Sequence, residues 1–450
     1  MALSVSPQVV ALKQLRADLS AAPWPILPLG DPEVAEINPK IDLKALDDDT
    51  PVSFLPMEAV EENTNTIHPT VRPVGEVRKG YTAFADNDVI WAKITPCMQN
   101  GKSALVRGLM NGVGSGSTEF HVLRAGPKTL PEFLWALLSM PRLLFAAQGA
   151  FAGSSGHQRV PASFLEELHA PIPPLSQQRH LVALLLDGQE RRDIALSKSR
   201  KIIREINSFV MNELGLVLSL PKKISAFATK RILLENRLDP FFYSPPFLAS
   251  ERQIAEQSHV VLDELVKFSN KIWDARSHPE ASFDYIEISG VDRVTGRAIP
   301  SRIAVENAPS RARMITKPGD ILVSLTPPHH GSIALLENQH EGCIASTGFA
   351  VICDVDKDRT TARFVWTMLR LSICLDQMLR RSSGGNYPAI TQDELAKVLI
   401  PLPDKATQQR ICDEVERRHI EARKLENEAQ SIWQAARQQF EDQLLNGLAP

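Results

Sequence analysis

The sequence predicts an α+β protein made of two similar mixed β/α domains, separated by an antiparallel pair of long coiled-coil helices and related as a pseudo-twofold internal repeat. Three observations lead to this prediction. The chain has 450 residues, which exceeds one ordinary domain. Short motifs occur twice in the same order, and each half of the chain ends in a long segment with a single apolar seam.

The internal repeat has a nearly constant spacing. Pro171–Pro173 returns as Pro401–Pro403, which begins 230 residues later (401 − 171). The other matched pairs are Gln177–Arg179 with Gln408–Arg410, Ser117 and Thr118 with Ser346 and Thr347, Phe133 and Trp135 with Phe364 and Trp366, Thr95–Pro96 with Thr326–Pro327, and Gly153–Gly156 with Ser382–Gly385. Matches in one order at nearly one spacing indicate a diverged duplication rather than a longer array.

Four segments follow one another along the chain. Residues 1–175 form the first mixed domain, which opens with a short helix over residues 6–20, and residues 216–406 form the second. Short β-branched runs punctuated by glycine and proline predict the strands of both domains. A central spacer helix covers residues 176–215 and a distal spacer helix covers residues 407–450, because a proline and a capping residue precede each and a glycine lies near its end.

The apolar seams predict that the two long helices pair with each other. In the distal helix the seam advances by steps of four and three residues, broken only at Arg418, and it consists of Ile411, Val415, Ala422, Leu425, Ala429, Ile432 and Ala436. The central helix has a similar seam that is weaker at Gly188, Arg192 and Ser199. Helices of about 40 residues are ~60 Å long, so antiparallel pairing holds the domains apart and lets each read one half-site of duplex DNA. The alternative is that each helix packs only on its own domain.

The composition argues against several classes of protein. The net charge is −3 and the pI is near 6.4, which argues against a histone-like nucleic-acid binder but allows local basic grooves. Five cysteines without a CxxC pair argue against a zinc site and a disulfide framework, and they fit a reducing cytoplasm. No signal peptide is expected, and no apolar run approaches the ~20 residues that cross a bilayer.

Motifs of the relevant enzyme classes are incomplete. The nearest string to the polar-Pro-Pro-aromatic loop of adenine methyltransferases is Asn386–Pro388, which lacks the double proline. Gly101–Ser103 matches the end of a phosphate-binding loop, but Pro96 stands where the first glycine should be. A Gly-x-Ser-x-Gly elbow is absent from the sequence, and the adjacent His329 and His330 point poorly at one metal. The sequence therefore predicts no catalytic residues, no metal and no cofactor in this chain.

Each half resembles the target-recognition domain and helical spacer of type I restriction-modification specificity subunits. The resemblance rests on residues 87–96, 101–102, 116–120, 156–160, 171–173 and 177–178 in the first half, and on residues 237–243, 319–324, 346–347, 385–390, 401–403 and 408–409 in the second. It implies a non-catalytic subunit that reads a bipartite asymmetric site in double-stranded DNA. It also implies two adenine-N6 methyltransferase subunits as partners, and restriction subunits in some complexes, with S-adenosylmethionine, ATP and magnesium bound only by these partners.

Polar and basic loop residues are the candidates for contact with DNA, since Arg and Lys pair with guanine and Asn and Gln with adenine. In the first half they are Lys93, Gln99, Asn100, Lys102, Ser155, His157, Gln158 and Arg159; in the second half they are Arg293, Arg297, Arg311, Arg313, His329, His330, Asn386 and Tyr387. Other interpretations stay open: glycine-rich loops can be architectural, arginines can be solvated surface charges, and the histidine pair can lie in a surface loop. Lys93 aligns with Leu325, so a contact by Lys93 has no equivalent in the second half.

Three other functions also remain open. The same architecture can serve a nuclease-free methyltransferase or another antiphage defence complex, which the neighbouring subunits would distinguish. An enzyme with its own methyl-transfer activity would methylate DNA as a pure chain. A plain coiled-coil scaffold would show no sequence preference in any assembly.

Overall fold

The computed structural model describes residues 6–152, 158–217, 239–277, 281–385 and 387–447. The candidate residues Ser155, His157 and Asn386 lie outside the described residues. The chain divides into two compact units, which are Met1–Ala195 with Asn427–Pro450 (unit 1) and Leu196–Glu426 (unit 2). Each unit therefore contains part of both long helices.

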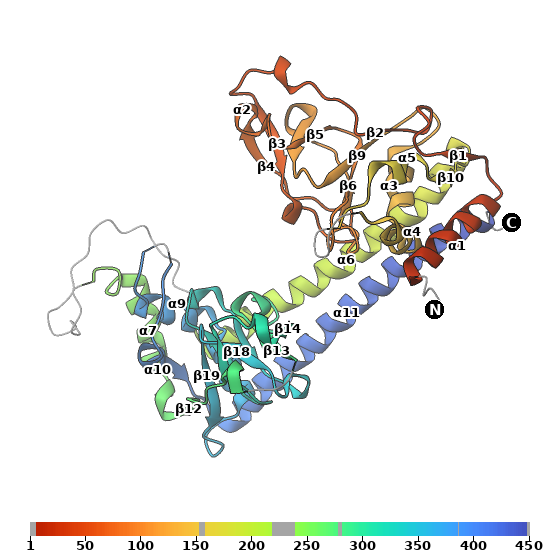
Figure 1. Ribbon diagram of the computed structural model, residues 1–450. Helices are drawn as coiled ribbons and strands as arrows, with labels where there is room; N and C mark the ends of the chain where they lie inside the picture. Colours follow the sequence, from red (N-terminus) through yellow and green to blue (C-terminus); the bar gives the residue numbers. More distant parts are fainter. Residues whose placement is uncertain (1–5, 153–157, 218–238, 278–280, 386, 448–450) are drawn as a thin grey trace. The chain divides into compact units, whose positions relative to one another are not determined.

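Unit 1 is a mixed set of short strands and short helices that precedes the first long helix (Figure 1). Its strands are β1 (Ile26–Pro28), β2 (Ala35–Ile37), β3 (Pro51–Leu55), β4 (Thr70–Pro73), β5 (Thr82–Ala85), β6 (Asp88–Ala92), β7 (Ser103–Leu105), β8 (Val113–Gly116), β9 (Phe120–Ala125) and β10 (His169–Pro171). Its short helices are α1 (Pro7–Ala21), α2 (Val74–Val77), α3 (Pro131–Leu138), α4 (Pro141–Ala147) and α5 (Ala162–Glu166).

The sheets of unit 1 are built around two central strand pairs. The strand orders are β2-β9-β6-β7, β4-β3-β8-β5 and β1-β10, and every pairing is antiparallel except β3 with β8. All residues of β6 are buried, because β9 and β7 flank this strand and α3 packs on all three. Phe133 and Trp135 of α3 belong to the core, as expected from their repetition in the sequence. The loop that leaves β6 is consequently carried by a rigid strand.

Unit 2 has the same kinds of element in the same order. Its strands are β11 (His259–Val261), β12 (Val266–Phe268), β13 (Ser282–Ile286), β14 (Ser301–Ala304), β15 (Ala312–Ile315), β16 (Ile321–Ser324), β17 (Ile333–Leu335), β18 (Ile344–Ser346), β19 (Phe349–Val355) and β20 (Leu399–Pro401). Its short helices are α7 (Pro245–Ala255), α8 (Ala362–Leu369), α9 (Ser372–Arg381) and α10 (Gln392–Ala396).

The strand orders of unit 2 reproduce those of unit 1. They are β12-β19-β16-β17, β14-β13-β18-β15 and β11-β20. The parallel pair β13–β18 corresponds to β3–β8, and β16 corresponds to the buried strand β6. The predicted internal repeat of two mixed domains is therefore confirmed at the level of strand order and direction.

Two long helices, α6 (Leu175–Glu213) and α11 (Lys405–Asn446), pack together in both units. In unit 1 the guanidinium of Arg192 lies 5.0 Å from the ring centroid of Trp433. In unit 2, Arg410 forms an ion pair with Glu213 at 2.8 Å. In each unit, later residues of α6 lie against earlier residues of α11. The predicted antiparallel pairing is therefore confirmed.

The positions that weaken the seam of α6 prove to be contacts with α11. Gly188 lies against Ala436, and Ser199 donates a hydrogen bond to Glu426 at 3.2 Å. On the other helix, the charged residue Arg418 interrupts the apolar seam of α11. Its guanidinium lies 4.7 Å from the ring centroid of Phe209 and so occupies this position of the interface. Small and cationic side chains thus complete a helix interface that the heptad pattern describes only in part.

Substitution of Gly188 by alanine is expected to destabilise the helix pair in unit 1. A Cβ atom at Gly188 would lie 2.4 Å from the Cβ of Ala436, so one helix must move. We expect overpacking to lower the free energy of unfolding by about 1–3 kcal/mol. This loss outweighs the ~1 kcal/mol by which alanine ordinarily stabilises a helix relative to glycine. Urea unfolding measures the change, and adding Ala436→Gly should restore part of the loss. A more stable Gly188→Ala variant would contradict the close approach.

The N-terminal helix α1 belongs to unit 1. Ser6 caps it by accepting a hydrogen bond from the backbone N–H of Val9 at 3.4 Å, and the helix packs on α4 and β10. Beyond it, Trp24 donates from its indole nitrogen to the carbonyl of Leu444 near the end of α11, at 2.7 Å. Among the described residues no single helix is long and apolar enough to cross a membrane, whereas the bent pair Pro131–Leu138 and Pro141–Ala150 meets that length and composition test together.

Candidate nucleic-acid interface

The loop after β6 brings three candidate residues of unit 1 together. The backbone N–H of Lys93 donates to the carbonyl of Glu119, and its carbonyl accepts from the N–H of Val160, both at 2.9 Å. The N–H of Thr95 donates to the carbonyl of Gln158 at 3.0 Å. Lys93, Gln158 and Arg159, which are far apart in the sequence, therefore lie in one cluster.

An acidic residue that the sequence did not indicate compensates charge in this cluster. Arg159 forms a two-point ion pair with Glu119, with N–O distances of 2.8 and 2.6 Å. The hydrogen bond from Arg159 lowers the pKa of the Glu119 carboxyl, and this outweighs the effect of burial, which raises it. Glu119 is thus charged at neutral pH, and Arg159 can contact a phosphate only in competition with it.

The remaining candidates of unit 1 lie on the next loop, which covers residues 96–102. Gln99 donates to the side chain of Gln148 at 3.1 Å, and Asn100 donates to the carboxylate of Glu62 at 2.9 Å. The ammonium group of Lys102 donates to the carbonyl of Met57 at 3.2 Å. Gln99 and Asn100 are exposed, whereas Lys102 is half-buried and oriented by a backbone partner. The loop therefore presents exposed amide side chains in fixed positions.

In unit 2, Arg293 and Arg297 lie on a tight turn between β13 and β14. The turn closes with the N–H of Asp292 donating to the carbonyl of Arg297 at 2.9 Å, and the side chain of Asp292 accepts from the N–H groups of Val294 and Thr295. Both arginines are exposed, and Arg297 forms an ion pair with Glu426 of α11.

The two adjacent histidines lie in a short 3₁₀ turn (Pro328–His330) after β16, with ring centroids 4.6 Å apart. Burial lowers the pKa of His329, and the nearby charges of His330 and Arg293 lower it further. The Nδ1 atom of His329 is buried and has no hydrogen-bond partner among the described residues. At neutral pH His329 is therefore an uncharged group beside Arg293 rather than a cation for a phosphate.

Arg311 and Arg313 form a separate group at β15, which is the edge strand of the sheet β14-β13-β18-β15. The carbonyl of Arg313 accepts from the N–H of Trp273 at 2.7 Å, and that of Arg311 accepts from Thr347 at 2.8 Å. Because these hydrogen bonds fix the backbone of both arginines, their exposed side chains project from a rigid strand edge. The structure does not join them to Arg293 and Arg297 in one contact network among the residues that it describes.

The glycine-rich loop of unit 2 begins directly after α9 and carries Tyr387. Ser383 and Ala389 exchange backbone hydrogen bonds of 2.8 Å, which close the loop, and Gly384 has a φ of +95° that favours glycine. Tyr387 is 80% exposed. The ends of the loop are thus architectural, while its tip presents an aromatic ring to solvent.

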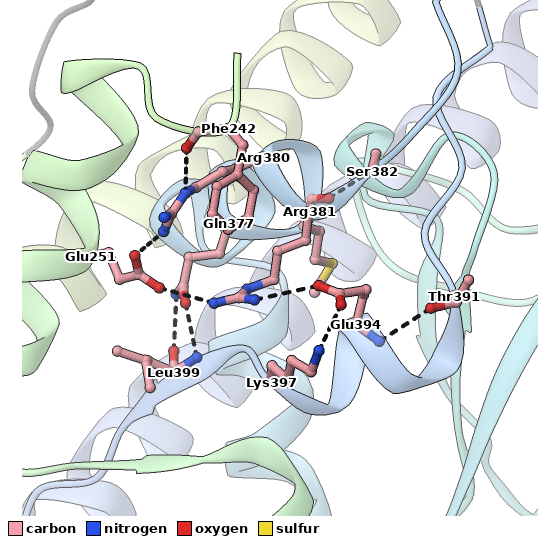
Figure 2. A network of polar contacts seen from close by, with 11 residues as sticks. Phe242, Glu251, Gln377, Arg380, Arg381, Ser382, Thr391, Glu394, Lys397 and Leu399 are labelled. Atoms are coloured by element: carbon pink, nitrogen blue, oxygen red, sulfur yellow. Dashed lines mark hydrogen bonds and ion pairs between the residues drawn. The ribbon is translucent and has the colours of Figure 1, made fainter. Parts of the chain in front are cut away.

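Two buried arginines form the base of this loop (Figure 2). The guanidinium of Arg380 donates to the carbonyl of Phe242 at 2.7 Å, and it lies 4.0 Å from the centroid of the Phe242 ring. Arg380 and Arg381 both pair with the carboxylate of Glu251, and Arg381 lies 3.4 Å from the carboxylate of Glu394. Three segments of unit 2 are thereby tied to the C-terminal end of α9.

Neutral side chains extend this base. Gln377 holds β20, because its amide donates to the carbonyl of Leu399 at 3.0 Å and accepts from the N–H of Leu399 at 2.8 Å. Thr391 caps α10 by accepting from the N–H of Glu394 at 3.2 Å, and Ser382 donates to the carbonyl of Met378 at 2.7 Å. The loop therefore starts and ends on a hydrogen-bonded platform.

Comparison with known proteins shows a similarity to one family. Residues 259–429 match the family described as the type I restriction modification DNA specificity domain. The specificity subunit of the Escherichia coli type I restriction enzyme EcoEI is 40% identical over 152 residues, which are 33% of this chain and 25% of that protein. That of the E. coli enzyme EcoAI is 39% identical over 151 residues, again 33% of this chain and 25% of that protein. The chain is thus similar to the specificity subunits of type I restriction enzymes through matches that cover part of its length.

The chain spans about a quarter of the length of these curated relatives in the matched region. A solved structure described as the HsdS subunit from Thermoanaerobacter tengcongensis is 18% identical, with a TM-score of 0.38 over 94% of this chain and 97% of that chain. Within the described part of the chain, no group of three or more His, Cys, Asp or Glu residues has the geometry of a metal site.

Sequence reasoning missed the buried residues that support the candidate loops of unit 2. Arg380 and Arg381 are both under 10% exposed, and Arg370 at the C-cap of α8 donates to the carbonyls of Arg293 and Val294. In the sequence, Arg380 and Arg381 form a basic pair at the end of an apolar helix. Such a pair is typical of an exposed C-terminal turn. Their burial depends on Glu251, which lies far away in the sequence and had no motif to indicate it.

Proposed function

We propose that this chain is the specificity subunit of a type I restriction-modification complex, which reads a bipartite asymmetric site in double-stranded DNA and performs no chemistry itself. Residues 1–175 act as one target-recognition domain and residues 216–406 as the other. Residues 176–215 and 407–450 act as the spacer helices between them. The complex works in the cytoplasm, and S-adenosylmethionine, ATP and magnesium are bound by the partner subunits.

The observation that carries this proposal is the repetition of one sheet architecture with polar loops at equivalent positions. The loop after β6 carries Lys93 and Asn100, and the loop after the equivalent strand β16 carries His329 and His330. Loops on rigid strands are suited to base reading, because discrimination requires side chains held to about 0.5 Å. Two matched reading units in one chain suit two different half-sites.

The proposed partners are two adenine-N6 methyltransferase subunits and, for restriction, a translocating nuclease subunit. Exposed apolar residues on α6 and α11, such as Leu186, Ile194 and Ile420, support docking of partners on the helix pair. The net charge of −3 also supports a complex in which partners supply many of the phosphate contacts.

Base-modification sequencing tests the proposal in cells that express this chain with its neighbouring methyltransferase. We expect methylated adenines in a two-part motif with a fixed gap, and loss of this motif in cells without the chain. Unchanged methylation by an active methyltransferase would refute the role. A nuclease-free complex would give the same motif without restriction of unmodified phage DNA, which identifies that alternative in the same cells.

Exchange of residues 1–175 for those of a homologue with a different target should change one half of the motif only. The physical reason is that each half-site is read by side chains of one unit, so base choice is local to that unit. The same sequencing measures both halves, and the unexchanged half is the internal control. A change in both halves would contradict modular reading.

A further inference from the structure

A turn in unit 1 lies between α11 and the candidate reading loop of residues 96–102. The turn covers residues 61–66, and Val60 and Ile67 pair across its base. The N–H of Glu61 donates to the carbonyl of Thr66 at 3.0 Å. Asn63 lies in the turn with a φ of +58°, a conformation that asparagine and glycine adopt more readily than other residues.

Two side chains of α11 hold Asn63 from one side. The indole nitrogen of Trp433 donates to the carbonyl of Asn63 at 2.7 Å. The guanidinium of Arg437 donates to the side-chain oxygen of Asn63 at 3.3 Å, and it also donates to the carbonyl of Ser139. Trp433 is itself buried and stacks on Trp135, with ring centroids 6.3 Å apart. Both donors are therefore fixed in the core of unit 1.

Asn63 in turn holds the reading loop from the other side. Its side-chain amide donates to the carbonyl of Asn100 at 2.8 Å, and its backbone N–H donates to the carbonyl of Gly101 at 3.2 Å. A Cβ atom on Gly101 would lie 2.2 Å from the side-chain oxygen of Asn63, so this contact leaves no room for a side chain there. One asparagine thus joins α11 to the segment that carries Gln99, Asn100 and Lys102.

The matching turn in unit 2 is held differently. Besides the hydrogen bonds of Asp292 within the turn, residues 292–297 are held by Arg370 at the C-cap of α8, which donates to the carbonyl of Arg293 at 3.3 Å and to that of Val294 at 2.7 Å. Toward α11, the exposed Arg297 of this turn forms an ion pair with Glu426. The link from α11 to the reading loop through one asparagine, Asn63, is therefore a property of unit 1.

We propose that Asn63 is a positioning residue that sets the base choice of unit 1 by fixing its 96–102 loop to α11. The proposal rests on the proposed DNA-reading function. Asn63 itself does not read a base: it determines where Asn100 and its neighbours stand, and an error of about 0.5 Å is enough to impair a specific contact. The half-site read by unit 2 does not depend on it.

The test compares the full chain, with its methyltransferase, as wild type and as Asn63→Gly. Glycine accepts the positive φ, so the turn should still fold, but the hydrogen bonds to Arg437 and Asn100 are lost. We expect about tenfold weaker discrimination at one or more base pairs of a single half-site, the size of one good base contact, with the other half-site unchanged. Base-modification sequencing gives both values.

The control is Asn111→Gly, because Asn111 has a similar φ of +54° and donates to the carbonyl of Pro51 without contacting α11. It should leave both half-sites unchanged. Should Asn63→Gly fail to fold, Trp433→Phe removes the indole donor and keeps an aromatic ring, and it should relax the same half-site more weakly.

An unchanged motif for the Asn63 and Trp433 variants, or equal loss in both halves, would overturn the positioning role alone. The absence of any two-part motif with the wild-type chain would instead overturn the proposed function and this inference with it.

Discussion

Replacement of Phe440 by alanine is expected to lower the free energy of unfolding of unit 1 by about 3–5 kcal/mol. Phe440 of α11 is 1% exposed, and its ring centroid lies 6.0 Å from that of Phe133 in α3. Truncation removes the buried ring and leaves a cavity that close-packed neighbours cannot fill. The effect is large because the last turns of α11 supply part of the core of unit 1.

Hydrogen exchange in a urea series measures this loss for each unit separately, which is necessary because a chain with two units need not unfold in one step. The protection of backbone amides against hydrogen exchange should fall in α3 and β6, while that of α9 should stay unchanged. The matched control is Gln434→Ala on an exposed position of the same helix, which should change stability by less than ~0.5 kcal/mol. A loss below ~1 kcal/mol for Phe440→Ala would mean that α11 is dispensable for unit 1.

Replacement of Glu251 by alanine should destabilise unit 2 by about 3–5 kcal/mol, the usual cost of removing one partner of a buried ion pair. Arg380 and Arg381 share this carboxylate, and both guanidinium groups are almost completely buried. The variant leaves two cations in a site with one carboxylate fewer, and their desolvation is no longer offset to the same extent.

The same exchange measurement should show the loss in α9, α10 and β20, with α3 unaffected. Lys397→Ala is the control, because Lys397 is 54% exposed and its ion pair with Glu394 lies at the rim of the network; such pairs contribute about 0–1 kcal/mol. If Glu251→Ala and Lys397→Ala have equal effects, the network is a surface feature and the loop base is not buried as described.

Much of the architecture was predictable because it depends on local pattern. Proline, a capping residue and a heptad seam indicate a long helix within a few residues, so the predicted helices at 176–215 and 407–450 lie close to α6 and α11. The repeat was visible because motifs such as Pro171–Pro173 return at one spacing. The pairing of the helices followed from their matched length and seam.

The candidate reading residues were only partly predictable. Their polar character and their position after the strands β6 and β16 could be inferred from composition and spacing. Their partners could not, because Glu119 and Glu426, which pair with Arg159 and Arg297, carry no local signal. Whether an arginine faces DNA or a neighbouring carboxylate depends on residues far away in the chain.

The sequence by itself determined that the protein is a duplicated α+β chain with two long helices, since periodicity and repetition are properties of neighbouring residues. Only the tertiary structure decided which strands lie parallel, that α11 contributes to both units, and that Asn63 and Glu251 hold the candidate loops. The physical reason is that these features depend on contacts between distant segments. Such contacts are selected by packing and charge compensation in three dimensions, and local propensity does not encode them.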